Sequence, residues 1–255
     1  MIRVELGLML RRRRVWLCWL LLCALPTLVA VLLATTRLVP PPGQGGAFLS
    51  AVVSDGQLFP AAALALVLPV FLPITVAVVA GDSIAGEAAA GTLRYLLVRP
   101  VGRLRLLIAK LLSVTAFVLL AVLFVTLTSY LVGIAAFGFG PNAVAGGGIA
   151  SLSGAVLTPA ELFTRTMGVV GYLGLCMLTL GAVGLFFSTL TDSPLAAALG
   201  VLAVVVTSAA LLPLDAAATI RPFLPTTHWL AWIDLYREPI LWPSIVRGVQ
   251  VQAGW

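Results

Sequence analysis

Several long stretches of this chain contain no ionisable residue, and they limit what the chain can fold into. Between Arg14 and Arg37 lie 22 uncharged residues, and between Asp55 and Asp82 lie 26. A helix needs about 20 mainly apolar residues to cross the hydrocarbon core of a membrane. Only 9% of all residues are charged, whereas a soluble domain usually carries about 25%. The bilayer must therefore be the solvent for most of the chain.

The same reasoning predicts five membrane-spanning helices in an all-α, polytopic helical bundle. The predicted spans cover residues 15–36, 58–80, 111–137, 166–190 and 194–214. The stretch from Gly138 to Gly154, rich in glycine and interrupted by Pro141, is typical of a loop. We expect residues 15–255 to form a single transmembrane domain.

Local patterns place two helix starts and one packing surface. Thr158-Pro159-Ala160-Glu161 is a capping box with proline at the first helical position, so this helix should begin before its span enters the lipid. Ser193-Pro194 starts the fifth span in the same way. Gly171, Gly174 and Gly181 fall on one side of the fourth span. Small residues in such a row let helix backbones approach closely.

The positions of the basic residues predict the orientation in the membrane. Residues 1–14 hold five arginines, and residues 82–110 hold four arginines and the only lysine. Basic residues favour the cytoplasmic side, so we expect a multi-pass protein of the inner (plasma) membrane with its N-terminus in the cytoplasm. Anionic headgroups account for the net charge of +6 without a nucleic-acid partner. Residues 1–14 have the pattern of an amphipathic cytoplasmic elbow, or alternatively are the cytoplasmic end of the first span.

The last part of the chain, residues 215–255, differs from the spans because charges and prolines interrupt it. Trp229, Trp232, Ile233 and Tyr236 can share one face of a helix. Trp and Tyr favour the boundary between membrane and water, so we expect an interfacial segment on the outer side. Residues 244–255 resemble the beginning of a further helix. Either the protein ends outside, or a sixth span follows Trp255, and we favour the second.

Residues 82–110 form the one substantial charged segment between predicted spans. The sequence around it, from Gly81 to Lys110, is GDSIAGEAAAGTLRYLLVRPVGRLRLLIAK. Its first part can form a short helix, Pro100 interrupts it, and Arg103 leads into the third span. A stiff protrusion of this kind can take a push from a separate motor and pass it to the two spans joined to it.

The segment resembles the first cytoplasmic loop of the ABC type-2 permeases. The matching pattern consists of Glu87, Gly91-Thr92-Leu93, Leu96-Leu97, Pro100, Arg103 and Lys110. The arginine-rich N-terminus, the short turn before Ser193 and the aromatic segment after the fifth span also fit. Family members usually have six spans. Only five are predicted here, so the missing sixth span is the main departure of this sequence from the family pattern.

The resemblance implies that two permease subunits, identical or different, pair in the membrane above a dimer of cytosolic ABC ATPases. The helix within residues 82–99 would then sit in a groove of the ATPase. The implied ATPase contacts are Glu87, Gly91, Thr92, Leu93, Arg94 and Arg99. Pro100, Arg103 and Lys110 would maintain the structure of the loop. ATP and Mg²⁺ would be bound by the partner, with export as the expected direction.

The residues themselves limit other functions. The only lysine lies between Ala109 and Leu111, so no G-x-x-x-x-G-K-[ST] motif exists and the chain needs a separate ATPase. We expect no cofactor or metal in this chain and no catalytic residue.

An intramembrane hydrolase would need a nucleophile and a base at one depth, and the only histidine, His228, is expected far from Ser83. An ion-coupled transporter, which would keep ionisable groups at mid-membrane, and a scaffold without transport activity remain alternatives. The absence of charge within the spans favours a hydrophobic or amphipathic cargo such as a drug, antibiotic, lipid or peptide.

Overall fold

The computed structural model describes residues 7, 9–36, 55–91, 102–139, 149–150 and 156–255. Four described helices are long and apolar enough to cross a membrane. They are α2 (Arg13–Thr36), α8 (Arg103–Phe137), α10 (Pro159–Leu190) and α11 (Pro194–Leu211). A bent pair adds a fifth crossing when it is counted as one span. The predicted all-α polytopic bundle is therefore confirmed, while the exact membrane boundaries along these helices stay predictions.

The bent pair corresponds to the second predicted span. It consists of η1 (Gly56–Leu58), which continues into α4 (Phe59–Val67), and of α5 (Phe71–Asp82), with an angle of 60° between the two arms. Pro69 lies in the break, where its ring prevents a continuous helix. Pro60 and Pro73 lie in the first turns of α4 and α5, where a missing N–H leaves no helical hydrogen bond unmade. The three prolines thus explain a broken span rather than a gentle kink.

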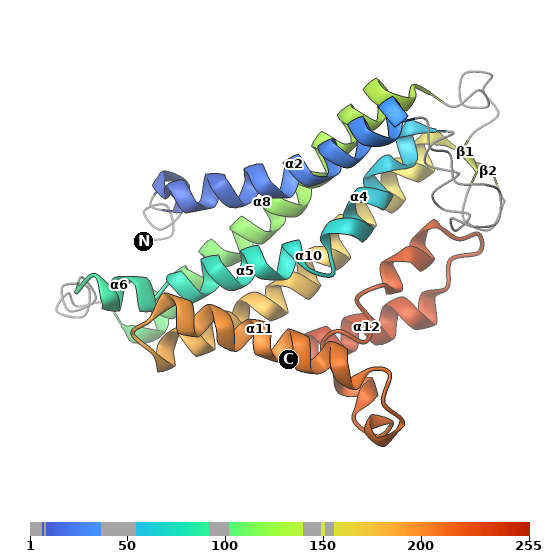
Figure 1. Cartoon of the computed structure of the whole chain (residues 1–255). Helices are drawn as coiled ribbons and strands as arrows, with labels where there is room; N and C mark the ends of the chain where they lie inside the picture. The colour runs from blue at the N-terminus through green and yellow to red at the C-terminus, as the bar shows by residue number, and fades with distance from the viewer. Residues whose placement is uncertain (1–6, 8, 37–54, 92–101, 140–148, 151–155) are drawn as a thin grey trace.

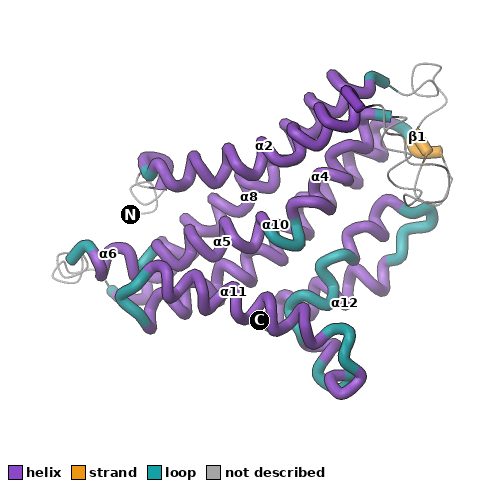
Figure 2. Tube along the Cα trace, in the orientation of Figure 1, coloured by secondary structure: helices purple, strands orange, loops and turns teal. Residues whose placement is uncertain are grey.

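The helices form a bundle with α4–α5 and α10 in the middle. Helices α2 and α8 pack together on one side, and α11 packs against α5 and α10 on the other (Figure 1). The remaining elements are short: α6 (Ala85–Ala89) at one end of the bundle, and the two-residue strands β1 (Ile149–Ala150) and β2 (Val156–Leu157) at the opposite end (Figure 2). We call the end that holds Arg12, Asp82 and Lys110 the basic end. The opposite end, which holds Pro159, is the distal end.

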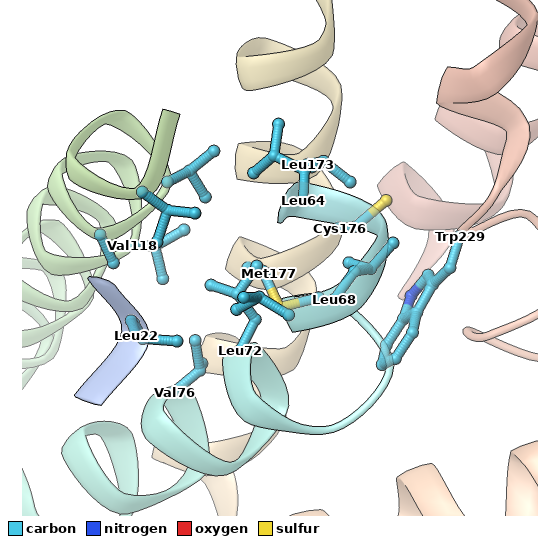
Figure 3. Packing of buried hydrophobic residues seen from close by; sticks show 14 of the residues in the cluster. Leu22, Leu64, Leu68, Leu72, Val76, Val118, Leu173, Cys176, Met177 and Trp229 are labelled. Carbon is cyan, nitrogen blue, oxygen red and sulfur yellow. The ribbon is translucent and has the colours of Figure 1, made fainter. Parts of the chain in front are cut away.

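The apolar core surrounds the break in the second span. Leu64, Leu68 and Leu72 are fully buried between α8 and α10, close to Leu173 and Met177 (Figure 3). On the other side of the core, the indole of Trp19 on α2 stacks on Phe117 of α8 with ring centroids 5.9 Å apart.

The small residues of α10 pack as the sequence predicts, with one exception. A Cβ atom on Gly174 or Gly181 would lie 2.7 Å from Leu119 or Val114 of α8, respectively. Gly171 has open space around its Cα and makes no such approach. The partner of this surface is therefore the chain's own α8.

The capping box that starts α10 is present. The Thr158 hydroxyl accepts a hydrogen bond from the backbone N–H of Glu161, whose carboxylate accepts one from the Thr158 backbone N–H. The backbone and hydroxyl of Thr158 keep the pKa of Glu161 below its ordinary value, so the carboxylate is ionised at neutral pH. Helix α10 has 32 residues and is about 48 Å long at 1.5 Å per residue. Because the hydrocarbon core is about 30 Å thick, α10 is longer than a single crossing needs, and its first turns are the part predicted to lie outside the lipid.

Residues 226–255 form a hairpin that packs along α10, which we call the distal hairpin. Its first arm contains η4 (Ala231–Tyr236), and its second arm is α12 (Trp242–Gly254). Between α11 and the hairpin, η2 (Asp215–Ala217) and η3 (Arg221–Phe223) make short turns. Trp229, Trp232 and Tyr236 are buried against the bundle instead of facing the membrane surface. The single amphipathic α-helix expected here is therefore wrong: the first arm is built from 3-10 turns, and its aromatic side chains complete the core.

Neutral hydrogen bonds fix the distal hairpin to α10 and α11. Tyr172 donates to the backbone carbonyl of His228 at 2.7 Å, and Thr179 donates to that of Gln252 at 3.0 Å. The Gln252 amide donates to the Pro225 carbonyl at 2.7 Å. On α11, the Ser208 hydroxyl lies 2.6 Å from that of Thr226.

The hairpin reaches deep into the bundle. At 1.5 Å per residue, Thr179 lies about 17 Å along α10 from its basic-end terminus at Leu190. This distance is close to half the thickness of the hydrocarbon core. Trp229 accordingly lies beside the break between α4 and α5 (Figure 3), which is also near mid-depth. The hairpin therefore packs along the middle of α10, and its placement relative to the membrane surface stays a prediction.

Candidate functional site

Two arginines at the start of α2 bind Asp82 at the end of α5. Arg12 interrupts the helix between Arg11 and Arg13, and its guanidinium lies 2.5 Å from one Asp82 carboxylate oxygen. Arg14 lies 2.9 Å from the other oxygen. The Asp82 side chain is only 14% exposed, whereas that of Arg14 is 67% exposed. The N-terminal segment is thereby joined to Asp82, the first residue of the charged segment 82–110.

A second ion pair joins α6 to α8. Glu87 of α6 accepts a hydrogen bond from the Lys110 ammonium, and Arg12 approaches the same Glu87 oxygen at 3.8 Å. The side chains of Lys110 and Glu87 are 3% and 12% exposed. A charge this deeply buried is costly unless it is paired, so Lys110 and Glu87 hold each other in place.

Ser188, near the end of α10, binds the turn between α5 and α6. Its hydroxyl donates to the Gly81 carbonyl at 2.8 Å and accepts from the backbone N–H groups of Ile84 and Ala85 at 3.1 and 2.9 Å. A glycine is required at position 81 because a Cβ there would lie 2.9 Å from the Ala198 backbone nitrogen on α11. The turn therefore contacts both α10 and α11.

Helix α6 is short and ends at a glycine. Its last turn is closed by the Gly91 N–H, which donates to the Ala88 carbonyl at 2.9 Å. Gly91 has φ of +68°, a conformation that residues with a side chain rarely adopt. The chain changes direction here, at the start of the Gly91-Thr92-Leu93 pattern.

The structure describes some of the predicted site residues but not others. Glu87 and Lys110 form an ion pair that the sequence did not predict, and Gly91 ends α6. Helix α8 begins at Arg103, as the sequence predicts. Thr92, Leu93, Arg94, Arg99 and Pro100 lie outside the described residues. The sequence did not predict the roles of Arg12, Arg14, Asp82 and Ser188, which hold the segment to the start of α2 and to α10. The arginine run and the acid at the start of the segment were visible signals, whereas nothing near Ser188 in the sequence marks its contact.

This arrangement connects α6 to several of the long helices. The residues from Asp82 to Glu87 are joined to the start of α2, to α8 and to the end of α10 by charge pairs and hydrogen bonds. A displacement of α6 would therefore move several crossing helices together. Among the described residues, no group of three or more His, Cys, Asp or Glu side chains could hold a metal ion.

A bundle of membrane-crossing helices with a braced charged segment at one end is characteristic of a membrane transport protein. The family model described as "ABC-2 family transporter protein" matches residues 1–241. The chain therefore belongs to the ABC-2 transporter family, as its resemblance to the ABC type-2 permeases predicts. Members of this family are membrane subunits of ABC systems without a nucleotide-binding domain of their own. A comparison with curated proteins found no match.

Proposed function

We propose that this chain is the permease subunit of an ATP-driven exporter and that separate ATPase subunits dock on residues 82–110. The observation that carries the proposal is the bracing of α6: its connections reach α2, α8 and α10 at once. A motor that tilts this element would rock several spans as one body. In this proposal the basic end faces the cytoplasm, and the ATPases hold ATP and Mg²⁺.

The burial of Glu87 changes its proposed role. Because its carboxylate pairs with Lys110, Glu87 positions α6 and contributes to ATPase binding mainly through that position. The direct contacts in this proposal are Thr92, Leu93, Arg94 and Arg99, which follow the turn at Gly91. Replacing Glu87 would therefore disturb folding and docking together, so it is a poor single test.

The distribution of polar groups supports ion-coupled transport less well than ATP-driven export. The groups near mid-depth, namely Thr179, Ser208 and Gln252, are neutral, and the described acidic residues lie at helix ends or in connecting segments. An ion-coupled transporter needs ionisable residues at such a depth. The same neutral interior supports a hydrophobic or amphipathic cargo.

A second permease subunit would complete the path. Helices α2 and α11 carry large exposed apolar side chains on the outside of the bundle. Examples are Trp16, Leu20, Leu199 and Val206. In the assembly we propose, lipid and the second permease share these faces.

The test is co-purification of the full chain from its native membrane, with identification of bound proteins by mass spectrometry. We expect a soluble ATPase that carries a P-loop, with ATP hydrolysis stimulated by the chain. Arg94→Glu combined with Arg99→Glu should remove both the bound ATPase and the stimulation. Arg221→Glu, at a site outside residues 82–110, is the control and should remove neither. Retention of the ATPase by the double variant would overturn the docking assignment.

A further inference from the structure

A cleft of about 500 Å³ opens between α4, α8 and α10 toward the distal end. Its volume is in the range of pockets that hold small ligands. The walls are mainly apolar: Leu127 comes from α8, and Phe163 and Met167 come from α10. All three side chains are partly or largely exposed on the outside of the bundle. The cleft therefore opens sideways, toward the lipid that surrounds these helices.

Among the described residues that line the cleft, two polar side chains make no hydrogen bond: Gln57 and, at the rim, Tyr130, which is 38% exposed. Gln57 is only 8% exposed, and its backbone N–H is bonded to Asp55. No hydrogen bond among the described residues involves its side-chain amide, which lines the cleft. The hydroxyls of Thr126 and Thr166 also line it, but they already donate to the carbonyls of Val122 and Leu162. Gln57 is thus the buried group placed to bind a polar atom of a ligand.

Backbone packing fixes the position of Gln57. A Cβ on Gly56 would lie 2.2 Å from the Gly133 carbonyl oxygen, so η1 and α8 touch through their backbones. The Gly56 N–H also donates to the Gly138 carbonyl at 3.2 Å. The backbone at the neighbouring Gln57 is therefore fixed relative to α8, which keeps this residue at the cleft. The Gln57 amide is open to the cleft and is not enclosed by the protein. Because a polar group removed from water without a partner is unfavourable by about 1–3 kcal/mol, a hydrogen-bond acceptor on a lipid that fills the cleft would stabilise this arrangement.

The depth of the cleft identifies the kind of ligand. Tyr130, at its rim, lies about 30 Å along α8 from Lys110 at the basic end. This distance equals the thickness of the hydrocarbon core, so Gln57 and Tyr130 lie near the boundary between acyl chains and headgroups. Lipid ester carbonyls lie at this boundary, and they accept hydrogen bonds. None of the described residues that line the cleft has an ionised side chain, so none of them selects a charged headgroup.

We propose that the cleft binds one phospholipid from the leaflet at the distal end. An acyl chain lies between α8 and α10, and an ester carbonyl accepts a hydrogen bond from the Gln57 amide. The site lies within a single subunit and does not depend on an ATPase. Failure of the ATPase proposal would therefore leave this inference standing, and the reverse also holds.

The test uses the purified full chain in phosphatidylcholine nanodiscs that contain a phosphatidylcholine probe with a diazirine on one acyl chain. After illumination, mass spectrometry maps the labelled residues. We expect preferential labelling within residues 123–130 and 159–167. Gln57→Leu, which keeps the size but removes the hydrogen bond, should lower this labelling about fivefold. Met167→Trp, which fills the cleft, should lower it by more than tenfold.

Leu28→Trp is the matched control, because Leu28 lies on an exposed apolar face of α2 whose only polar group, Thr27, is already bonded to the Cys23 carbonyl. This variant should leave labelling of the cleft unchanged. If Met167→Trp does not fold, as judged by circular dichroism and gel filtration, Leu127→Trp on the opposite wall replaces it.

Equal labelling of α2 and of the cleft, unaffected by the filling variants, would show ordinary annular lipid and overturn the proposal. A phosphatidylglycerol probe should label the cleft equally well, and labelling by only one headgroup type would contradict the assignment.

Discussion

At the basic end, Arg12, Arg14, Asp82, Glu87 and Lys110 hold the segment between two spans with charge pairs. At the distal end, neutral hydrogen bonds such as those of Thr179 and Ser208 hold the hairpin of residues 226–255 to α10 and α11, and the Arg165 guanidinium also donates to the Leu235 and Arg237 carbonyls of the hairpin. The ion pair between Arg165 and Glu238 at this end lies near the start of α10, in the part predicted to lie outside the lipid.

The difference follows from the cost of burying charge. An ionised group at mid-membrane is unfavourable by several kcal/mol, whereas a neutral hydrogen bond can be made there at little cost. The ion pairs of the basic end lie at helix ends, and only Arg12 and Arg14 among their members are substantially exposed. The neutral contacts of the hairpin fill the interior of the bundle. The comparison therefore predicts that charge changes act mainly at the basic end, with Arg165 as the exception at the distal end, and that steric changes act where the hairpin packs on α10.

The largest effect should come from removing Glu87. Glu87→Ala leaves the Lys110 ammonium almost fully buried without its carboxylate, which should lower the free energy of unfolding by about 3–4 kcal/mol. Adding Lys110→Met should restore most of this loss, because an apolar pair needs no compensating charge. Unfolding by SDS in mixed micelles measures both variants. A loss below about 1 kcal/mol for the single variant would show that this pair does not hold α6.

The steric counterpart at the distal end is Gly248. A Cβ there would lie 2.0 Å from the Tyr172 hydroxyl, so Gly248→Ala should displace α12 and lower the free energy of unfolding by about 2–3 kcal/mol. Gly254→Ala in the same helix meets nothing within 4 Å and serves as the control, expected to be neutral or slightly stabilising. The same unfolding assay measures both. Similar values for the two glycines would contradict the close approach of α12 to α10.

Some features of the fold were predictable from sequence because they depend on neighbours in the chain. The capping box at Thr158 and the start at Ser193-Pro194 are local patterns, and both begin helices in the structure. The close approach of Gly174 and Gly181 also followed from helical spacing. The positions of Pro60 and Pro73 near helix starts show why a span with three prolines breaks only at Pro69.

The remaining features depend on residues far apart in the chain. Arg12 meets Asp82 across 70 residues, and Ser188 meets Gly81 across 107, so no sequence window contains either pair. The distal hairpin was placed at the membrane surface because Trp and Tyr favour that boundary. The same side chains also suit a buried core, and composition cannot distinguish the two environments. Only the fold shows that Trp232 is fully buried.

A smaller effect is expected at Ser188. Ser188→Ala leaves the N–H groups of Ile84 and Ala85 without their acceptor and the Gly81 carbonyl without its donor. Unfolding in micelles should show a loss of about 2 kcal/mol. Thr189→Ala, which removes only an exposed bond within α10, should change stability by less than about 0.5 kcal/mol. Equal losses would show that the turn before α6 is not held by Ser188.

The smallest effect should come from Arg14, whose side chain is largely exposed. Arg14→Ala should change the free energy of unfolding by less than about 0.5 kcal/mol, and added salt should reduce even that. The measurement is the same unfolding titration at low and high ionic strength. A loss above about 1 kcal/mol that persists at high salt would place Arg14 among the essential contacts of the basic end.

The most direct test of the account is a cross-link from the basic end to a partner in the native membrane. A photoreactive p-benzoylphenylalanine replaces Thr92 in one variant and Phe223, which is exposed near the distal hairpin, in the other. The account predicts an adduct between position 92 and a soluble P-loop ATPase, identified by mass spectrometry, and no such adduct from position 223. Absence of the adduct at position 92, or equal adducts at both positions, would contradict the claim that the braced segment at the basic end is where an ATPase docks.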